Sequence, residues 1–389
     1  LDIGVIQESN SPWSSRLTLV KKPDNSWRPC VDYRRLNNIT KGDAYPLPNI
    51  DQILHRISKS KYFTKLDLYS GYWQMPLNPA DREKTAFLSP TGGLYEFLTM
   101  PFGLKNAPAS FQRMMEKILK PAIDKGFCEV YIDDIVIHSK TMEEHVRHVN
   151  FVFNLIAQAQ LKMKIEKCTF GQTTIEALGY IISQNSLQAL AHKCEAITKH
   201  QVKHTKKGIQ SFLGLVRYYQ RFVPNLSEKS QPLTFLTRTG HDVSKEWGSE
   251  QDEAVEKIKE AFFSPEILMA FDPNLKILLQ TDASNFAMGA VLAHELPDGT
   301  EKAVCYASKT FDRAQQNYSV TEKEGLAVVW ATEMFRNLLL GRTFTLQTDH
   351  SALKHILTDK AATGRLGRWV AKLQEFDMLV TYRKGQENA

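Results

Sequence analysis

Two adjacent carboxylates, Asp133 and Asp134, most constrain how this chain of 389 residues folds. Strand-forming residues precede them in 127–132 and follow them in 135–137, so the pattern predicts a hairpin whose turn lies at the two aspartates. A purely structural two-residue turn favours Asn-Gly or Asp-Gly, and neighbouring carboxylates repel each other. The pattern therefore favours a cation, and hard oxygen ligands on a turn suit Mg²⁺. A solvated acidic loop is the alternative that so short a motif leaves open.

A third carboxylate, Asp67, ends a second apolar segment, Lys65 to Leu68, that is typical of a buried strand. If this strand lies beside the hairpin, two or three carboxylates meet at one point. Such a group can hold two cations about 4 Å apart, as in-line phosphoryl transfer requires. The sequence therefore predicts a polymerase-type site in which Asp67 and Asp133 hold metal and Asp134 supports them.

Seven further segments occur in a fixed order along the chain. They are WRPCVDYRRLN (27–37), KLDLYSGYWQMPL (65–77), MPFGLKNAPASFQ (100–112), VYIDDIVIHS (130–139), LGYIIS (178–183), GLVRYYQRFVP (214–224) and QTDAS (280–284). With these segments the whole chain resembles the reverse transcriptase and ribonuclease H portion of the Pol polyprotein of Gypsy-type long-terminal-repeat retrotransposons. The expected activity is RNA-directed DNA synthesis, also DNA-templated, with ribonuclease H degrading the RNA of RNA/DNA hybrids.

The resemblance implies an α+β multidomain fold, a right-hand polymerase with fingers, palm and thumb followed by a ribonuclease H-like α/β domain. We expect fingers and palm in 1–185, a thumb in 186–245, a connecting helix in 246–268 and the ribonuclease H-like domain in 269–389. The basic residues support the thumb, because 186–245 holds ten Lys or Arg against three Asp or Glu while the whole chain has a net charge of +6. A basic segment of this kind is typical of binding to a phosphate backbone.

The resemblance also assigns residues around the polymerase site. Tyr72 matches the residue that excludes the 2′-hydroxyl of a ribonucleotide, although aromatic residues are more often part of a core. The lysines near 21 could instead only discourage edge pairing of an exposed hairpin. The implied nucleotide-binding residues are Lys21, Lys22, Arg28, Tyr72, Phe102 and Gly103, and the implied primer or duplex contacts are Leu178, Gly179, Tyr180, Arg217 and Arg221.

Three later acids, Asp282, Glu324 and Asp349, match the metal-binding carboxylates of ribonuclease H and are expected to hold two further Mg²⁺ ions, with Mn²⁺ as a substitute at both sites. Glu324 has a second interpretation, because Thr321 and Glu324 also fit a helix capping box. The family's fourth carboxylate lies beyond residues 385–388, so we expect an incomplete nuclease site in a C-terminally truncated domain.

Two histidines, His145 and His148, lie three residues apart on a predicted helix without a third ligand type, so we expect packing or surface roles and no metal site. Five scattered cysteines indicate neither zinc nor disulfides. No apolar run approaches the roughly 20 residues of a membrane span.

The expected partners are an RNA template, a DNA primer-template, an RNA/DNA hybrid, deoxynucleoside triphosphates and the protease and integrase segments of the same polyprotein. Since the chain begins with Leu1, we interpret it as a piece of that polyprotein, acting in cytoplasmic retrotransposon particles without a membrane partner. Residues 187–192 (LQALAH) depart from the family pattern. They leave an alternative open, a catalytically decayed or domesticated copy that binds nucleic acid or a protein.

Overall fold

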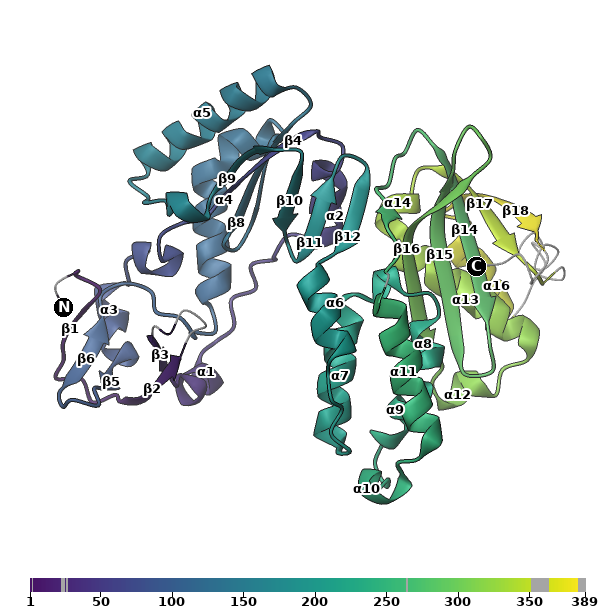
Figure 1. The fold of residues 1–389 in the computed structure, drawn as a ribbon, viewed down its shortest axis with the longest axis horizontal. Coiled ribbons are helices and arrows are strands. Elements are labelled where there is room, and N and C mark those ends of the chain that lie inside the picture. Colours follow the sequence, from purple (N-terminus) through teal and green to yellow (C-terminus); the bar gives the residue numbers. More distant parts are fainter. Residues whose placement is uncertain (2, 22–24, 26, 264, 351–363, 384–389) are drawn as a thin grey trace. The chain divides into compact units, whose positions relative to one another are not determined.

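The computed structural model divides into two compact units, Leu1–Leu178 and Gly179–Ala389 (Figure 1). It describes all residues except 2, 22–24, 26, 264, 351–363 and 384–389. Each unit mixes helices with sheets, and the division into four domains expected from the sequence stays a prediction. Among the described residues, no helix is both long and apolar enough to cross a bilayer.

The first unit begins with a five-stranded sheet of order β1-β6-β5-β2-β3. Two of its strands, β2 and β3, form the hairpin predicted before the WRPCVDYRRLN segment, with Lys21 opposite Trp27. Its elements are β1 Ile6–Glu8, β2 Ser15–Lys21, β3 Trp27–Val31, β5 Phe87–Leu88 and β6 Leu94–Phe97, with the short helices α1 Arg34–Ile39 and α3 Pro79–Arg82.

A four-stranded sheet of order β7-β8-β4-β9 follows in the same unit. Its apolar residues pack against α4, where the predicted stripe is confirmed because Phe111, Met115 and Leu119 are fully buried. Pro108 lies in the first turn of α4, where its missing N–H costs nothing. The elements are β4 Tyr62–Leu66, β7 Cys128–Tyr131, β8 Asp134–Ser139, β9 Thr169–Gln172, α2 Ile50–Ile57, α4 Ala107–Asp124 and α5 Met142–Gln158, with β10 Thr174–Ala177 near the end of the unit.

The second unit opens with strands and helices that cover the predicted thumb. The divergent residues 187–192 form the end of β12 and the start of α6, and β12 pairs with both β11 and β13. The elements are β11 Tyr180–Ser183, β12 Ser186–Ala189, β13 Leu268–Met269, α6 Ala191–Thr198, α7 Lys206–Tyr218, α8 Leu226–Lys229, α9 Gln231–Leu236, α10 Val243–Glu246 and α11 Ser249–Phe263.

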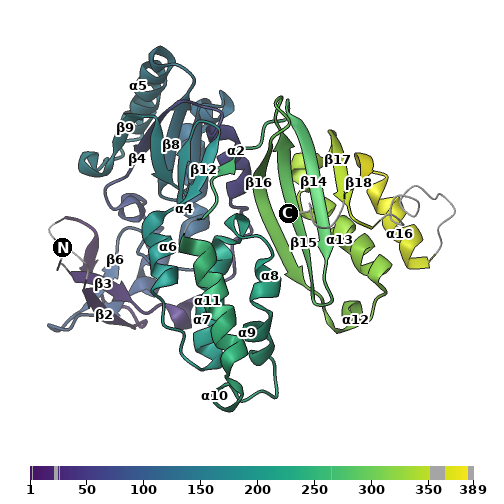
Figure 2. The ribbon, with the colours of Figure 1, turned by 45° about the vertical axis from the view of Figure 1, so that its right-hand side comes forward.

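A five-stranded sheet of order β16-β15-β14-β17-β18 completes the second unit (Figure 2). The first three strands pair antiparallel, whereas β14, β17 and β18 run parallel. Helices α13 and α16 contribute Val328, Val329 and Leu373 to one apolar core with the sheet. The elements are β14 Lys276–Ala283, β15 Ala287–Glu295, β16 Glu301–Thr310, β17 Thr343–Thr348, β18 Asp377–Tyr382, α12 Arg313–Gln316, α13 Val320–Met334, α14 Arg336–Leu339 and α16 Gly364–Leu373.

Candidate active sites

The first candidate site lies where β4 ends beside the β7–β8 hairpin. These strands are antiparallel, and Leu66 pairs with Ile135, so the residue after β4 lies next to the hairpin turn. Asp67 follows β4 directly and Asp133 lies in the turn. The sheet therefore brings together the two carboxylates that the sequence placed in one site.

The turn itself is one residue earlier than the sequence predicted. Tyr131 pairs with Asp134, which makes Ile132 and Asp133 the two turn residues and Asp134 the first residue of β8. Ile132 has a φ of +54°, a conformation that is rare and strained for a β-branched residue. The prediction of a turn at Asp133 and Asp134 is wrong, because a side chain from another element holds Ile132 in this conformation.

The residue that holds Ile132 is Gln112 on α4, which the sequence interpretation missed. Its side chain is fully buried, its Oε1 accepts from the Ile132 N–H at 2.6 Å, and its Nε2 donates to the Val130 carbonyl at 2.9 Å. A glutamine inside the apolar stripe between Phe111 and Met115 was the available signal, since buried amides need partners.

Asp133 lies in a strongly negative environment. Burial, Asp134 and Asp67, in that order, raise the pKa of the Asp133 carboxyl. Gly71 lies beside this carboxylate and closely against Phe111, because an added Cβ would lie at an ordinary contact distance of 3.6 Å from Asp133 Oδ1 but only 2.9 Å from the Phe111 ring. Repulsion between neighbouring carboxylates raises their pKa values, and a bound divalent cation relieves this repulsion.

Asp134 has a different environment from Asp133. Its Oδ1 lies 2.7 Å from Lys65 Nζ, and its Oδ2 accepts from the Leu178 N–H at 2.9 Å. Both oxygens of the third predicted metal ligand therefore have protein partners.

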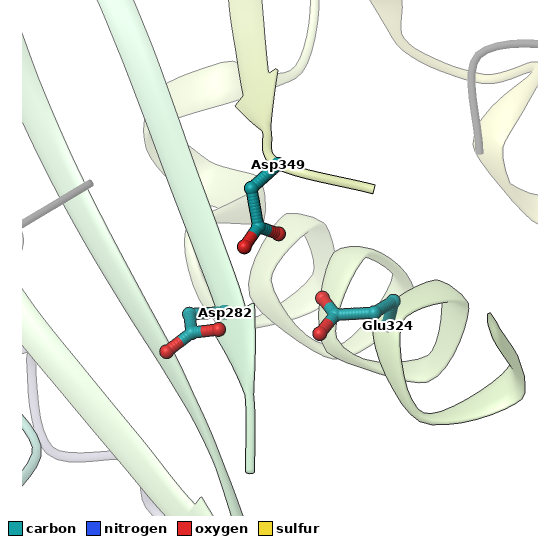
Figure 3. A group of neighbouring side chains, drawn as sticks. All are labelled: Asp282, Glu324 and Asp349. Carbon is teal, nitrogen blue, oxygen red and sulfur yellow. The ribbon is translucent and has the colours of Figure 1, made fainter. Parts of the chain in front are cut away.

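The second candidate site is formed by Asp282 on β14, Glu324 on α13 and Asp349 directly after β17 (Figure 3). Each contributes a carboxylate oxygen, and these oxygens lie within 4.8 Å of one another. This is the trio of acids that the sequence assigned to one metal site.

The capping interpretation of Glu324 is wrong. The capping box of α13 is formed by Ser319 and Glu322, two residues earlier, so Glu324 lies inside the helix and faces the other acids. Glu324 is buried, its Oε1 accepts from the Ala283 N–H at 3.2 Å, and its Oε2 has no hydrogen-bond partner among the described residues. Burial, then Asp282 and Asp349, raise the pKa of Glu324 to about 8. An unpaired buried oxygen among like charges fits a cation ligand.

Comparison with known proteins finds one family model for each of two parts of the chain. The family model for reverse transcriptase (RNA-dependent DNA polymerase) matches residues 20–182, and the model for the RNase H-like domain found in reverse transcriptase matches 272–376. Over the whole chain, the Drosophila melanogaster Pol polyproteins from transposons 297 and opus are 41% and 38% identical, and the Schizosaccharomyces pombe transposon Tf2-3 polyprotein is 37% identical.

The chain is a reverse transcriptase and ribonuclease H region of a long-terminal-repeat retrotransposon Pol polyprotein. This Pol segment spans 36%, 40% and 29% of the lengths of those three relatives.

Solved structures confirm the expected fold class. The foamy viral protease-reverse transcriptase dRH in complex with ds DNA is 26% identical, with a TM-score of 0.84 over 100% of the Pol segment and 68% of that chain. The foamy viral protease-reverse transcriptase in complex with RNA/DNA hybrid is also 26% identical, with a TM-score of 0.78 over 98% of the Pol segment and 52% of that chain.

In the Pol segment, Tyr72 lies near the first candidate site. It has features of both interpretations made from the sequence, a core aromatic and the residue that excludes a 2′-hydroxyl. It is buried, and its ring centroid lies 5.0 Å from those of Phe102 and Phe111, as for a core aromatic. Burial and the nearby Asp133 also raise the pKa of Tyr72 to about 12, so Tyr72 is also close to Asp133. Phe102 is half exposed, and Gly103 has a φ of +95°, so this loop presents one open aromatic face.

The predicted basic residues of the β2–β3 hairpin are only partly described. Lys21 ends β2 and is exposed. Arg28 lies in β3 opposite Val20, but its side chain lies outside the described residues, as does Lys22.

The predicted primer and duplex contacts fall into two groups. Leu178 and Gly179 both have positive φ and form the turn between β10 and β11. Tyr180 is buried, and its ring is stacked on the ring of Tyr218. The predicted primer contact at Tyr180 would therefore involve its backbone and not its ring. The second group is the two arginines of the predicted thumb: Arg217 is exposed on α7, and the Arg221 guanidinium lies 5.7 Å from the centre of the Tyr180 ring.

The histidine prediction is confirmed by a packing role. Thr64 Oγ1 lies 2.7 Å from His145 Nε2, and Ser139 Oγ lies 2.9 Å and 2.8 Å from the Nδ1 atoms of His145 and His148. The expected fourth carboxylate follows residues 385–388, and these lie outside the described residues.

Proposed function

We propose that the Pol segment is an RNA- and DNA-templated DNA polymerase with an attached ribonuclease H that degrades the RNA strand of hybrids. One observation carries the polymerase assignment: the β4–β8 pairing places Asp67 beside the Asp133 turn, next to Tyr72. Because this site lies in the part that matches the reverse transcriptase family, a templated nucleotidyl transfer is the chemistry that it supports best.

The carboxylates of both sites fit divalent cations, and we propose Mg²⁺, with Mn²⁺ as a substitute. Asp67 and Asp133 would hold the polymerase metals; Asp282, Glu324 and Asp349 would hold the nuclease metals. When bound, paired ions supply Lewis acidity, which lowers the pKa of an attacking oxygen and neutralises charge on the leaving group.

The protein's own residues would orient the substrates. The Tyr72 ring would lie against the nucleotide sugar and exclude a 2′-hydroxyl, while Phe102 and Gly103 line the same pocket and Lys21, Lys22 and Arg28 bind the triphosphate. The turn at Leu178 and Gly179 would place the primer 3′ end, and Arg217 and Arg221 would contact the phosphate backbone. At the second site, Asp282 would hold a metal at the scissile phosphate of the RNA strand.

The proposed partners are an RNA template, a DNA primer-template, an RNA/DNA hybrid and deoxynucleoside triphosphates. Two solved relatives support the duplex partners, since they are complexes with ds DNA and with RNA/DNA hybrid. The relatives support a polyprotein setting, since their names describe polyproteins of transposons. We propose protease and integrase segments of the same polyprotein as further partners, and cytoplasmic retrotransposon particles as the place of action.

A cross-over experiment tests both activities. Primer extension on an RNA template and cleavage of a labelled RNA/DNA hybrid are measured with Mg²⁺ for the parent, Asp133→Asn and Asp282→Asn. We expect Asp133→Asn to lose extension only and Asp282→Asn to lose cleavage only. A parent that binds the duplex but shows neither activity would support the alternative, a decayed copy that only binds nucleic acid.

A further inference from the structure

The second aspartate of the catalytic hairpin is tied to a segment that lies more than forty residues further along the chain. Asp134 Oδ2 accepts from the Leu178 N–H at 2.9 Å, and Asp134 Oδ1 lies 2.7 Å from Lys65 Nζ. Lys65 Nζ also donates to the Glu176 carbonyl at 3.2 Å. Two side chains thus make two separate polar contacts with the backbone of 176–178.

The two side chains lie on one face of the sheet. Lys65 pairs with Val136, so Asp134 is its diagonal neighbour two residues away, at a distance that long side chains reach. Their side chains are 25% and 26% exposed, so water screens this ion pair less than a pair on an open surface.

Both side chains that make these contacts belong to residues close in sequence to the proposed metal-binding acids. Lys65 lies two residues before Asp67, and Asp134 directly follows Asp133. Leu178 has a φ of +54°, a backbone conformation that L-residues seldom adopt. The Asp134 carboxylate accepts from the Leu178 N–H and so fixes the direction of this N–H.

We propose that Asp134 is a positioning residue and not a metal ligand: with Lys65 it holds the turn at Leu178 against the sheet edge that carries Asp67 and Asp133. The proposal rests on the proposed polymerase function, in which this turn places the primer 3′ end. The contacts of Asp134 and Lys65 join the turn to the residues beside both metal-binding acids. They therefore set the distance between the primer terminus and the metal site before either substrate binds.

The first test uses the whole protein without metal or nucleic acid. Amide hydrogen exchange of peptides covering 174–183 is compared in the parent, Asp134→Ala, Asp134→Asn and Lys65→Met. We expect exchange at Leu178 to be about tenfold faster in Asp134→Ala, and less affected in Asp134→Asn, whose amide oxygen still accepts the hydrogen bond.

The matched control is Asp124→Asn, which removes an exposed carboxylate of the same unit that pairs with Lys120 one turn away. It should leave exchange of 174–183 unchanged.

The second test separates positioning from metal binding. Mn²⁺ affinity, measured by titration of the protein alone, should be the same in Asp134→Ala and the parent and should fall about tenfold or more in Asp133→Asn. In primer extension, Asp134→Ala should lower kcat about tenfold without changing the half-saturating Mg²⁺ concentration. Adding Lys65→Met to Asp134→Ala should cause little further loss, because the two residues act as one unit.

Two results would overturn the proposal. One is unchanged exchange of 174–183 in Asp134→Ala; the other is a loss of Mn²⁺ affinity in Asp134→Ala as large as in Asp133→Asn. A parent that does not extend primers would instead refute the proposed function, and the exchange and Mn²⁺ measurements would still decide the role of Asp134.

Discussion

At the scale of a single residue, Gln112 holds the turn at Ile132 and Asp133, because its amide bonds to the Ile132 N–H and to the Val130 carbonyl. We predict that Gln112→Leu lowers kcat for extension at least about tenfold, equivalent to about 1.4 kcal/mol in the barrier. The loss follows from freeing the turn, so duplex affinity should be unchanged. Gln158→Leu, at an exposed position near the end of α5, is the control. Equal kcat values in both variants would remove Gln112 from the site.

Tyr72 combines packing with a position beside Asp133. We predict that Tyr72→Ala lowers discrimination against ribonucleotides by a factor on the order of 10 to 100, because loss of the ring opens room for a 2′-hydroxyl. The measurement is the ratio of kcat/KM for deoxy- and ribonucleotides. Tyr72→Phe keeps the ring and should discriminate as the parent does. If Tyr72→Ala also discriminates like the parent, the residue is only part of the core.

Glu324 predicts a pH dependence of stability in the metal-free protein. Its folded pKa, about 8, lies above its ordinary value of 4.5, so the unfolded chain ionises first as pH rises. Stability from this group is therefore present below pH 4.5 and is lost progressively up to about pH 8.

The measurement is the melting temperature in EDTA at pH 5 and pH 8. The melting temperature of Glu324→Gln should rise relative to that of the parent as the pH rises. Adding Mg²⁺ at pH 8 should restore the melting temperature of the parent. Glu333→Gln, exposed on the same helix, should behave as the parent does. An advantage of Glu324→Gln that is the same at both pH values would show that repulsion among the three acids is not its cause.

Single residues also show where sequence reasoning reached its limit. Thr321–Glu324 and Ser319–Glu322 both fit a capping box, and only the burial of Glu324 against Asp282 distinguishes them. The role of Asp134 likewise depends on Leu178, a contact across more than forty residues that local pattern does not encode.

At the scale of elements, the sequence predicted strand ends that neighbouring residues determine. The strand predicted in 127–132 is confirmed as β7 Cys128–Tyr131, and a glycine, Gly126, lies just before it. The hairpin turn was misplaced by one residue because Gln112, twenty residues away, stabilises the positive φ of Ile132. Elements were predictable where their ends carry turn residues, and not where a distant side chain sets the backbone.

The β4–β8–α5 layer holds a buried histidine network that predicts acid sensitivity. Burial, and then His148, Arg56 and His145, lower the pKa of His138 to about 3. The unfolded chain therefore gains protons below pH 6.5 while the folded chain does not, so stability falls from pH 6.5 towards pH 3.

We predict that this one group lowers the unfolding free energy by about 1.4 kcal/mol in total between pH 7.5 and pH 5.5, measured by urea unfolding at both pH values. His138→Gln should reduce the slope, whereas the exposed His192→Gln should not. A slope that His138→Gln leaves unchanged would assign the acid sensitivity to other groups.

At the scale of the whole molecule, the carboxylates of each candidate site belong to one compact unit. Asp67 and Asp133 lie in Leu1–Leu178 together with Asp134, and Asp282, Glu324 and Asp349 lie in Gly179–Ala389. The two activities should therefore be separable by single substitutions.

The central claim is that Asp67 and Asp133 form the metal site of a templated polymerase. It is tested most directly by primer extension on an RNA template with Mg²⁺, comparing the parent with Asp133→Asn and measuring primer-template affinity in parallel. We predict that Asp133→Asn loses at least about a thousandfold in extension rate, roughly 4 kcal/mol, while affinity stays within about twofold. Extension by Asp133→Asn at the parent's rate would contradict the claim.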